Sequence, residues 1–568
     1  MKKGLMVVVI LILASVAHYM YKGVDNVTKP GQKGLSYQEA VAKLSEQVKN
    51  IHWTENIVQR RAKIQLGQKQ DWKSRLPEID QFKLVINPPD SPNEVIPEIF
   101  VSTEKSGDGT DGLVVEIARD FNAQNKRLSN GKTARVKIRK IASGTAYEFI
   151  ASEKYQPDGF SPSNQLWVDM AGAHGVKLTP IRKQWIGNIA GIVMKTSAVN
   201  KLKTAYGNAD VKTIIDAVAQ GKLVMGYTDP FASSTGLNFL VTVLATFAAG
   251  DPAKMLSPEV VSSFETFQRG VPFVALTTIQ MRESVENDGS LEAFVMEYQT
   301  YVNTQSLKAG YEFIPFGPRH DNPLYGIGNI SSEKKEVLEA FAAFAEQNQY
   351  KQIATKYGFN PTIRYEPSIQ MPDGKLLVQA QTLWKEKKDA GRHIAAVFLC
   401  DISGSMAGAR ISQLKKALLG GSEFISPENS IGLVVFNQQV SLLVPVKKFD
   451  LSHKAAFFAA VEDMDSGGKT AMYDGIAVSL HLLLKEKEKD PNTKLMLFVL
   501  TDGETNVGLE FSHTNAVIRG IQIPIYTIGY EANISELQRL SSLVEAASMN
   551  AGEGDIRYKI GTLLNAQM

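Results

Sequence analysis

The sequence predicts an α/β protein built from several domains, and three observations lead to that prediction. The chain has 568 residues, more than one hydrophobic core usually serves. From about residue 98 onward, short apolar runs typical of strands alternate with amphipathic runs typical of helices, as in sheets covered by helices on both faces. Proline-rich sequence at 87–97, and again from 361 to 372, interrupts the alternation and indicates domain boundaries.

Composition and charge narrow the classes of function. Hydrophobic residues make up 44% of the chain and charged residues 21%, an ordinary globular balance, and the formal net charge is +3. So small a net charge gives no positive electrostatic potential that would attract nucleic acid. We therefore exclude nucleic acid as a partner. Cys400 is the single cysteine, which excludes an internal disulfide or a cysteine zinc site. It ends the apolar run 394–400, which predicts a small core residue.

The first 23 residues are typical of an export signal. Lys2 and Lys3 precede an apolar run at 5–17, and Ser15-Val-Ala17 has the small side chains that a signal peptidase requires. The run is shorter than the roughly 20 residues of a spanning helix, but the aromatic residues after it could extend it into an anchor. Residues 1–23 are therefore predicted as a signal peptide or an N-terminal membrane anchor, and the body of the protein as extracytoplasmic, either secreted, periplasmic or held at the membrane.

Residues 24–95 are predicted as a helical stalk and a proline-rich linker. Apolar residues recur loosely at helical spacing over 36–75, which favours one amphipathic helix that serves as a stalk or a packing arm. The prolines of 87–97 then prevent the helix from continuing.

Residues 96–360 are predicted as a domain of two α/β lobes. The expected strands are 99–102, 134–141, 189–194 and 222–226, and the expected helices are 113–125, 147–153 and 237–247. Alternation of this kind places a sheet between helices. Residues 361–390 contain Pro367 and Pro372 and are predicted as a linker.

Residues 391–568 are predicted as a further α/β domain. The expected strands are 394–400, 431–436, 440–446, 495–500 and 523–528, and the expected helices are 411–424, 454–464, 472–485 and 512–519. The strands on either side of 437–439 form a hairpin, which predicts one antiparallel edge strand on a parallel sheet. The first and fourth strands lack polar alternation, as strands buried on both faces do.

Oxygen-bearing side chains follow several of these strands. Asp401, Ser403 and Ser405 alternate directly after the strand that ends at Cys400, at the carboxyl end of the sheet where ligands gather. Thr470 precedes a predicted helix, and Asp502 follows the most apolar strand. Three hydroxyls and two carboxylates without nitrogen or sulfur predict a site for a hard cation, with Mg²⁺ as the first choice and Mn²⁺ or Ca²⁺ as alternatives. Taken alone, the Asp-Ile-Ser-Gly-Ser string also fits a helix cap and a tight turn.

The three loops together resemble the metal-ion-dependent adhesion site of the von Willebrand factor type A domain, a doubly wound, Rossmann-like fold. The resemblance covers about 175 residues, and all five positions match. It implies that Ser403, Ser405 and Thr470 bind the metal through hydroxyls, and that Asp401 and Asp502 bind through water or at longer range. It also implies an open coordination position for an acidic group of a protein partner.

The middle domain carries fainter marks of a ligand pocket. Hydroxyl-bearing turns precede several predicted helices, and a helix N-terminus attracts anions, so a small anionic ligand is expected there. The pattern resembles the extracellular solute-binding proteins of ABC importers, in the two-lobed periplasmic-binding type that includes sulfate and molybdate receptors. By that resemblance, the pocket candidates are Ser102, Ser143, Ser161, Ser234 and Thr235. Serine and threonine before helices also serve simply as caps.

The function expected from these features is binding rather than catalysis. No Gly-x-Ser-x-Gly turn is present, and no pair of the eight histidines has the spacing of a zinc helix. The first hypothesis is a non-enzymatic envelope protein that engages an acidic group of a partner through the cation, with a middle domain that binds a small ligand or is vestigial. The alternatives are a receptor for an oxyanion-like solute of an ABC importer, and a component of a metal-chelatase machine, which export argues against.

Overall fold

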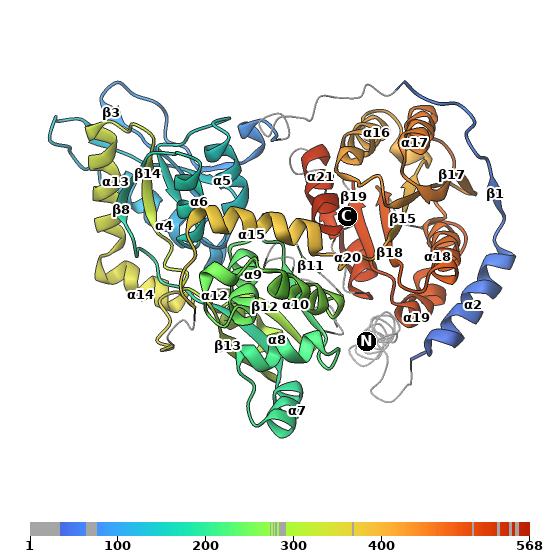
Figure 1. The fold of residues 1–568 in the computed structure, drawn as a ribbon. Helices are drawn as coiled ribbons and strands as arrows, with labels where there is room; N and C mark the ends of the chain where they lie inside the picture. The colour runs from blue at the N-terminus through green and yellow to red at the C-terminus, as the bar shows by residue number, and fades with distance from the viewer. Residues whose placement is uncertain are drawn as a thin grey trace, which may run out of the picture.

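The computed structural model describes residues 34–63, 76–272, 274–275, 278, 281–282, 291–365, 369–502, 505–530, 534–544, 548–550 and 556–568. A two-lobed middle domain and a C-terminal domain lie side by side, with helix α15 (Gly374–Lys387) between them (Figure 1). The predicted export signal or anchor, residues 1–23, lies outside the described residues. Within the described ranges, no helix is both long enough and apolar enough to cross a membrane.

The two predicted lobes are confirmed, since each is built on its own sheet. Lobe 1 has the strand order β2 (Leu84–Ile86), β6 (Lys137–Lys140), β4 (Glu98–Val101), β7 (Gly159–Ser161), β14 (Leu324–Ile327), β8 (Leu178–Arg182). Its helices are α4 (Leu113–Ala123), α5 (Ser143–Ala151), α6 (Leu166–Ala173), α13 (Ser332–Ala345) and α14 (Asn348–Lys356). The short pair β3 (Glu94–Val95) and β5 (Thr133–Ala134) lies apart from this sheet.

Lobe 2 has the strand order β11 (Val274–Ala275), β10 (Met225–Thr228), β12 (Ala293–Glu297), β9 (Ala190–Lys195), β13 (Tyr311–Pro315). Its helices are α7 (Thr196–Tyr206), α8 (Val211–Ala219), α9 (Ser234–Phe247), α10 (Pro258–Arg269) and α12 (Tyr298–Asn303). The chain crosses between the lobes after β8 and again before β14. The backbones of Asn188 and His320 form an isolated antiparallel bridge where the two crossings meet.

The segment expected as a linker, 361–390, contains the helix α15 (Gly374–Lys387). The prolines stand before this helix, and Asp373 caps it by accepting a hydrogen bond from the Leu376 N–H at 2.8 Å. Its buried face packs against α6, α9 and α10. The Asp389 carboxylate just beyond it pairs with Lys388 and with Lys494 of the C-terminal domain, each at 3.0 Å. The helix is therefore a packed connection between the domains.

The C-terminal domain is a seven-stranded sheet with helices on both faces. The strand order is β1 (Trp53–Glu55), β17 (Val440–Lys448), β16 (Ser430–Phe436), β15 (Ile394–Asp401), β18 (Lys494–Thr501), β19 (Ile525–Gly529), β20 (Ser548–Asn550). The helices are α16 (Ala409–Gly421), α17 (Leu451–Asp463), α18 (Met472–Lys489), α19 (Phe511–Ile521), α20 (Ile534–Ser542) and α21 (Ile556–Gln567). Strand β17 is antiparallel to β16, as predicted. It is not the edge strand, however, because β1 pairs with its other side.

The predicted stalk is wrong for the residues that the structure describes. Helix α2 (Tyr37–Asn50) ends at residue 50 instead of continuing to 75, because Ile51 is extended and the chain enters β1. The buried face of α2, with Ala40, Leu44 and Val48, packs against α18 and α19 (Figure 1). Strand β1 pairs in parallel with β17. The apolar face that indicated a stalk helix thus covers the C-terminal domain.

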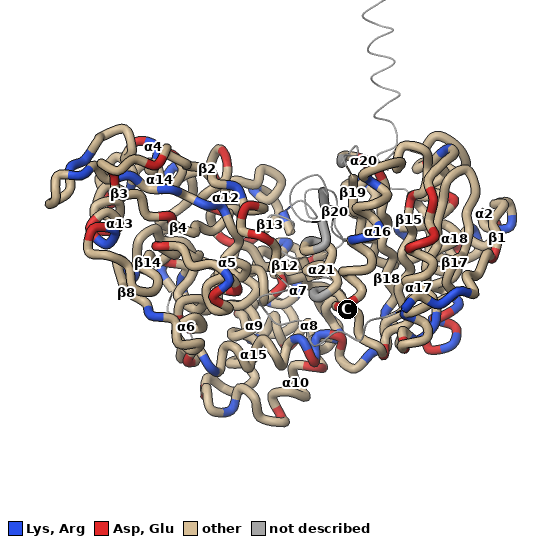
Figure 2. Tube along the Cα trace, turned by 90° about the horizontal axis from the view of Figure 1, so that it is seen from above, with Lys and Arg blue, Asp and Glu red and all other residues tan. Residues whose placement is uncertain are grey.

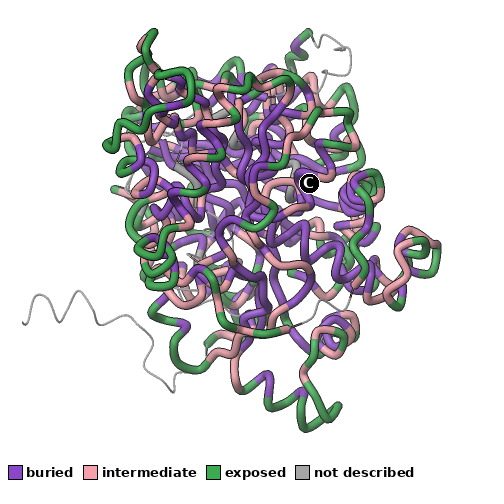
Figure 3. Tube along the Cα trace, turned by 90° about the vertical axis from the view of Figure 1, so that its left-hand side faces the viewer, coloured by how far each residue is buried: buried purple, intermediate pink, exposed green. Residues whose placement is uncertain are grey.

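Burial and charge follow from this architecture. Buried residues run through the strands of the sheets, while exposed residues gather on the outer helices and loops (Figure 3). Cys400 is buried in β15, as predicted. Acidic and basic residues are interspersed over both halves of the molecule (Figure 2), in keeping with the small net charge.

We predict that Leu44→Ala destabilises the C-terminal domain, although residue 44 is far from it in sequence. Leu44 is 1% exposed, so its truncation leaves a cavity that costs about 2–5 kcal/mol. The thermal unfolding midpoint should fall, while Glu46→Ala on the exposed face of the same helix should leave it within about 1 °C. Equal midpoints for the two variants would contradict the packing of α2.

Candidate functional site

Three loops of the C-terminal domain meet at the carboxyl ends of β15 and β18. These strands are adjacent and parallel, with Cys400 opposite Leu500. Asp401 is the last residue of β15, and Asp502 follows β18 directly. The third loop, 464–471, leads into α18, so that Thr470 arrives at the same edge of the sheet.

Asp401 organises the turn that follows β15. Its carboxylate is buried, with one oxygen accepting a hydrogen bond from the Ser403 N–H at 2.7 Å and the other from the Thr501 hydroxyl at 2.5 Å. Burial raises the pKa of Asp401, as does the nearby charge of Asp502, while the hydrogen bonds from Ser403 and Thr501 oppose the shift. Asp401 thus holds the turn in place by hydrogen bonds to both neighbouring strand ends.

The two serines and Asp502 form a continuous chain of oxygens. The hydroxyl oxygens of Ser403 and Ser405 lie 3.0 Å apart, and the Ser405 hydroxyl donates to Asp502 Oδ1 at 2.7 Å. The second oxygen, Asp502 Oδ2, accepts a hydrogen bond from Arg410 at 2.7 Å, and the same arginine donates to the carbonyl oxygen of Ser405. Arg410 therefore balances the charge of a carboxylate that is fully buried.

Backbone hydrogen bonds hold the loop of Thr470 against the other two loops. Gly404 donates to the carbonyl oxygen of Gly468 at 3.0 Å, and Gly467 donates to that of Ile402 at 2.8 Å. On the other side, the Thr470 N–H donates to the Asn506 side chain at 2.9 Å. Thr470 is buried between the two loops. Among the described residues, Thr470 forms its hydrogen bonds through its backbone, and its hydroxyl is not bonded to the serines or the aspartates of the site.

The oxygens present fit a hard divalent cation. Neighbouring oxygens around octahedral Mg²⁺ lie about 2.9 Å apart, because each metal–oxygen bond is about 2.0–2.1 Å long. The Ser403–Ser405 and Ser405–Asp502 separations of 3.0 and 2.7 Å match that spacing. Among the described residues, no group of three His, Cys, Asp or Glu side chains could hold a metal, so a cation here relies on hydroxyls.

In the middle domain, the five predicted pocket residues converge on the seam between the lobes. Each is buried, and each stands at a strand end or a helix start that faces the other lobe. The five residues are Ser102 after β4, Ser143 at the start of α5, Ser161 at the end of β7, and Ser234 and Thr235 at the start of α9. The structure thus brings the candidates of both lobes together, although nothing in their contacts identifies a solute.

Glu104 and Lys105 form a buried ion pair beside Ser102. The ammonium of Lys105 contacts the Ser102 hydroxyl, Asn322 Oδ1 at 2.9 Å and the Ser161 carbonyl oxygen at 3.0 Å. Burial lowers the pKa of Lys105, and the carboxylates of Glu104 and Glu297 oppose that shift. Glu104 accepts hydrogen bonds from Ser102 at 2.5 Å and Ser163 at 2.8 Å. These bonds and Lys105 lower its pKa, although burial alone would raise it.

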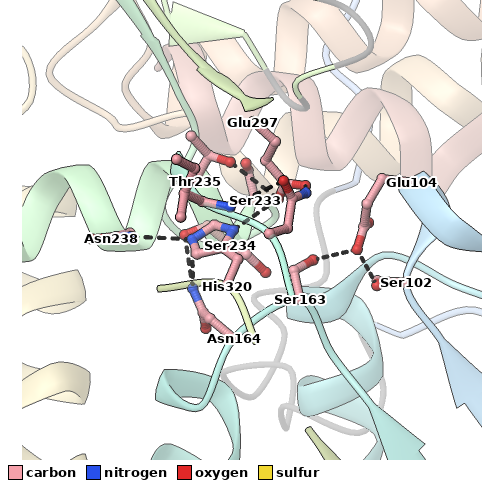
Figure 4. A network of polar contacts seen from close by, with 12 residues as sticks. Ser102, Glu104, Ser163, Asn164, Ser233, Ser234, Thr235, Asn238, Glu297 and His320 are labelled. Carbon is pink, nitrogen blue, oxygen red and sulfur yellow. Dashed lines mark hydrogen bonds and ion pairs between the residues drawn. The ribbon is translucent and has the colours of Figure 1, made fainter. Parts of the chain in front are cut away.

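His320 connects the rest of the seam (Figure 4). Its Nδ1 lies 2.9 Å from Glu297 Oε1, and its Nε2 lies 3.2 and 3.1 Å from the amide nitrogens of Asn164 and Asn238. Amide nitrogens only donate, so Nε2 accepts and the ring proton is on Nδ1, which donates to Glu297. Thr235 also donates to Glu297, at 3.4 Å. Burial raises the pKa of Glu297, and the charge of Glu104 adds to the rise.

Sequence reasoning missed several residues of both sites. In the C-terminal domain it missed Arg410, which pairs with Asp502, and Asn506, which positions Thr470. In the middle domain it missed Glu104, Lys105 and Glu297. One signal was available, because Glu104 and Lys105 stand directly after a predicted buried strand and beside the candidate Ser102. The partners of Glu297 and His320 depend on how the lobes close, which local sequence does not record.

Comparisons with known proteins assign both domains. Residues 106–360 match the family model of the bacterial extracellular solute-binding protein, and residues 396–555 match that of the von Willebrand factor type A domain. Inter-alpha-trypsin inhibitor heavy chain H3 of Pongo abelii is 31% identical over 152 residues, which cover 24% of this chain and 17% of the relative. Heavy chain H4 of Homo sapiens is 30% identical over 119 residues, covering 20% of this chain and 12% of the relative. The chain therefore spans a small part of these curated relatives.

Three solved structures are similar to parts of the chain. The sulfate-binding protein SubI from Mycobacterium tuberculosis H37Rv has 13% identity and a TM-score of 0.33, covering 51% of this chain and 96% of that one. A periplasmic thiamin binding protein has 11% identity and a TM-score of 0.36, covering 54% and 99%. A von Willebrand factor type A protein from Catenulispora acidiphila has 15% identity and a TM-score of 0.28, covering 31% and 42%. By its two family matches, the chain combines a bacterial extracellular solute-binding domain with a von Willebrand factor type A domain.

Proposed function

We propose that this chain is a non-enzymatic binding protein that acts outside the cytoplasm and engages an acidic group of a protein partner through a divalent cation. The observation that carries the proposal is the chain of oxygens from Ser403 through Ser405 to Asp502, whose spacing is that of neighbouring ligands on one ion. Ser403, Ser405 and Thr470 would hold the cation through hydroxyls, with Asp401 and Asp502 supplying the negative charge. The N-terminal residues 1–23 would export the chain or anchor it at the membrane.

The hydroxyl-rich donor set decides what such a site can do. With neutral hydroxyls as the direct ligands and the two aspartates acting through water, a divalent cation would stay strongly attracted to a further carboxylate, which the partner would supply. Asp401 keeps the turn in position, and the exposed Ser405 marks the side open to solvent. We favour Mg²⁺, with Mn²⁺ or Ca²⁺ as alternatives, because all the ligands are oxygen.

The alternative, a transport receptor for an oxyanion, is less favoured by the middle domain. Glu104 and Glu297 are both buried in the seam where the predicted pocket residues meet. An oxyanion placed there would bring a further negative charge beside two carboxylates in a poorly solvated region, which costs free energy. A thermal-shift series with sulfate, phosphate and molybdate tests this alternative, since saturable stabilisation by one of them would support a receptor.

We predict that the full chain binds Mg²⁺ in a calorimetric titration and that Ser405→Ala weakens the affinity at least tenfold. The change removes one ligand at an exposed position and leaves the buried Asp401 in place, so the fold should be preserved. Asp465→Ala is the matched control, because it removes an exposed carboxylate of the Thr470 loop that is not among the proposed ligands. Indistinguishable affinities of the two variants would reject the proposed site.

We predict that Arg410→Ala lowers the thermal midpoint in chelating buffer and makes the chain respond more strongly to Mg²⁺. The change leaves the buried carboxylate of Asp502 without its cation, which lowers the midpoint by about 5 °C or more. A divalent ion can then neutralise Asp502 without competition from the guanidinium group. Lys416→Ala, exposed on the same helix, is the control. A Mg²⁺ response equal to that of the unaltered chain would mean that arginine and metal do not compete.

We predict that the immobilised chain retains a protein from envelope extract in Mg²⁺ and releases it when a chelator is added. The partner's carboxylate completes the coordination of the ion, so retention depends on the ion itself. Asp465→Ala should retain the same protein, and Ser405→Ala should not. Retention that survives chelation would place the interaction elsewhere on the surface.

A further inference from the structure

The seam between the lobes of the solute-binding domain contains a cation that belongs to the chain itself. Lys105 is 0% exposed, and its ammonium has three protons to donate. Three acceptors face it: the Ser102 hydroxyl, Asn322 Oδ1 at 2.9 Å and the Ser161 carbonyl oxygen at 3.0 Å. Two more oxygens, of Pro162 and Glu104, lie at 3.4 and 3.5 Å. The ammonium is thus fully hydrogen-bonded inside the protein.

These acceptors occupy the place where the sequence predicts a solute. Ser102 and Ser161 are two of the five candidate pocket residues, and they end neighbouring parallel strands of lobe 1. Asn322 belongs to the segment that crosses from lobe 2 back to lobe 1, and its side chain also donates to the Ile186 carbonyl oxygen of the other crossing. Lys105 therefore connects the pocket wall of lobe 1 to the hinge of the domain.

The two lobes are in direct contact on either side of Lys105. Trp167 of lobe 1 donates to the Ser234 hydroxyl of lobe 2 at 2.8 Å, and the Asn164 amide donates to the Ser234 carbonyl oxygen at 3.2 Å. At Gly144, a Cβ would overlap the carbonyl oxygen of Phe231, so the two backbones touch there. Hydrogen bonds thus join the two lobes across the seam, while Ser161 Oγ and Asn164 Oδ1 are buried there without a hydrogen-bond partner among the described residues.

The charge of the seam selects a positive group over a negative one. Glu104 and Glu297 are buried, one in each lobe, and the ammonium of Lys105 lies 3.5 Å from Glu104 Oε1. Without a cation, two carboxylates would stand in a poorly solvated space, which is costly. A positive group that donates hydrogen bonds therefore offsets this cost in the seam.

We propose that Lys105 acts as a built-in ligand of the solute-binding domain: its ammonium binds the pocket residues of lobe 1, joins them to the hinge and so keeps the lobes closed without a solute. The class of ligand that this site accepts is then a primary ammonium, and the site becomes available only when Lys105 is shortened. The proposal concerns the middle domain alone and does not depend on the cation site of the C-terminal domain.

The test replaces the lysine by a free amine. Lys105→Ala removes three carbons and the nitrogen, which together are propylammonium, so this probe should restore what the mutation removes. The variant should lose about 5–10 °C in thermal midpoint, as expected for a buried charge pair that loses one partner. Propylammonium chloride should recover at least half of that loss with saturation. Tetramethylammonium, which cannot donate hydrogen bonds, and sodium chloride at equal ionic strength should not.

Two further variants separate this role from general loss of stability. Lys105→Met has a side chain of similar length without charge, so its midpoint should also fall, but propylammonium should find no space and have no effect. Lys183→Ala removes an exposed lysine of the same domain and should match the unaltered chain. If Lys105→Ala does not fold when expressed, refolding it with and without propylammonium gives the same comparison as a yield.

The closed state can be measured with two spin labels. Cys400 is buried, so cysteines introduced at the exposed positions Lys126 in lobe 1 and Thr204 in lobe 2 can be labelled selectively. The unaltered chain should give a single distance that sulfate and propylammonium leave unchanged. Lys105→Ala should add longer distances that propylammonium removes. The proposal is overturned if a solute moves the lobes of the unaltered chain, or if Lys105→Ala stays closed and ignores the amine.

Discussion

Two parallel strands, β15 and β18, lie side by side in the centre of the C-terminal sheet and end at the same edge. Their pairing runs from Ile394 opposite Lys494 to Cys400 opposite Leu500, so Asp401 and Asp502 leave the sheet together. Nearly every residue of both strands is buried, which makes a slip of this register very costly. The contacts of the site depend on that pairing. Thr501 donates a hydrogen bond to Asp401, Ser405 donates one to Asp502, and backbone hydrogen bonds hold the loop 464–471 against the turn after β15.

The C-terminal domain could be predicted closely from the sequence because its signals are local. Continuous apolar runs locate strands buried on both faces, and a hydroxyl-rich turn after such a run locates the site at a strand end. The five oxygen-bearing residues were named on that basis, and the structure joins Asp401, Ser403, Ser405 and Asp502 by hydrogen bonds, directly or through the backbone. Arg410 could not be predicted, because a surface arginine on a helix gives no local sign of pairing with a buried carboxylate.

Contacts between segments that are far apart in the sequence could not be predicted. The sequence around Leu44 shows an apolar helix face. It does not show that this face packs against α18 and α19, which follow more than 400 residues later. In the middle domain, hydroxyls at strand ends point toward an anion, whereas the structure also buries two carboxylates in the seam, Glu104 of lobe 1 and Glu297 of lobe 2. Their burial depends on how the lobes are assembled, so the sequence alone does not reveal it.

Strand β1 has a topological consequence. Because β1 joins the sheet that resumes at residue 394 and α2 packs against the same domain, the solute-binding domain lies between two segments of the C-terminal domain. It is attached at two points, one through the chain before residue 76 and one through α15. Two covalent attachments restrict swivelling far more than one linker does, because loop closure has already reduced the accessible orientations. A partner bound at the proposed cation site would thus meet a second domain whose range of orientations is restricted.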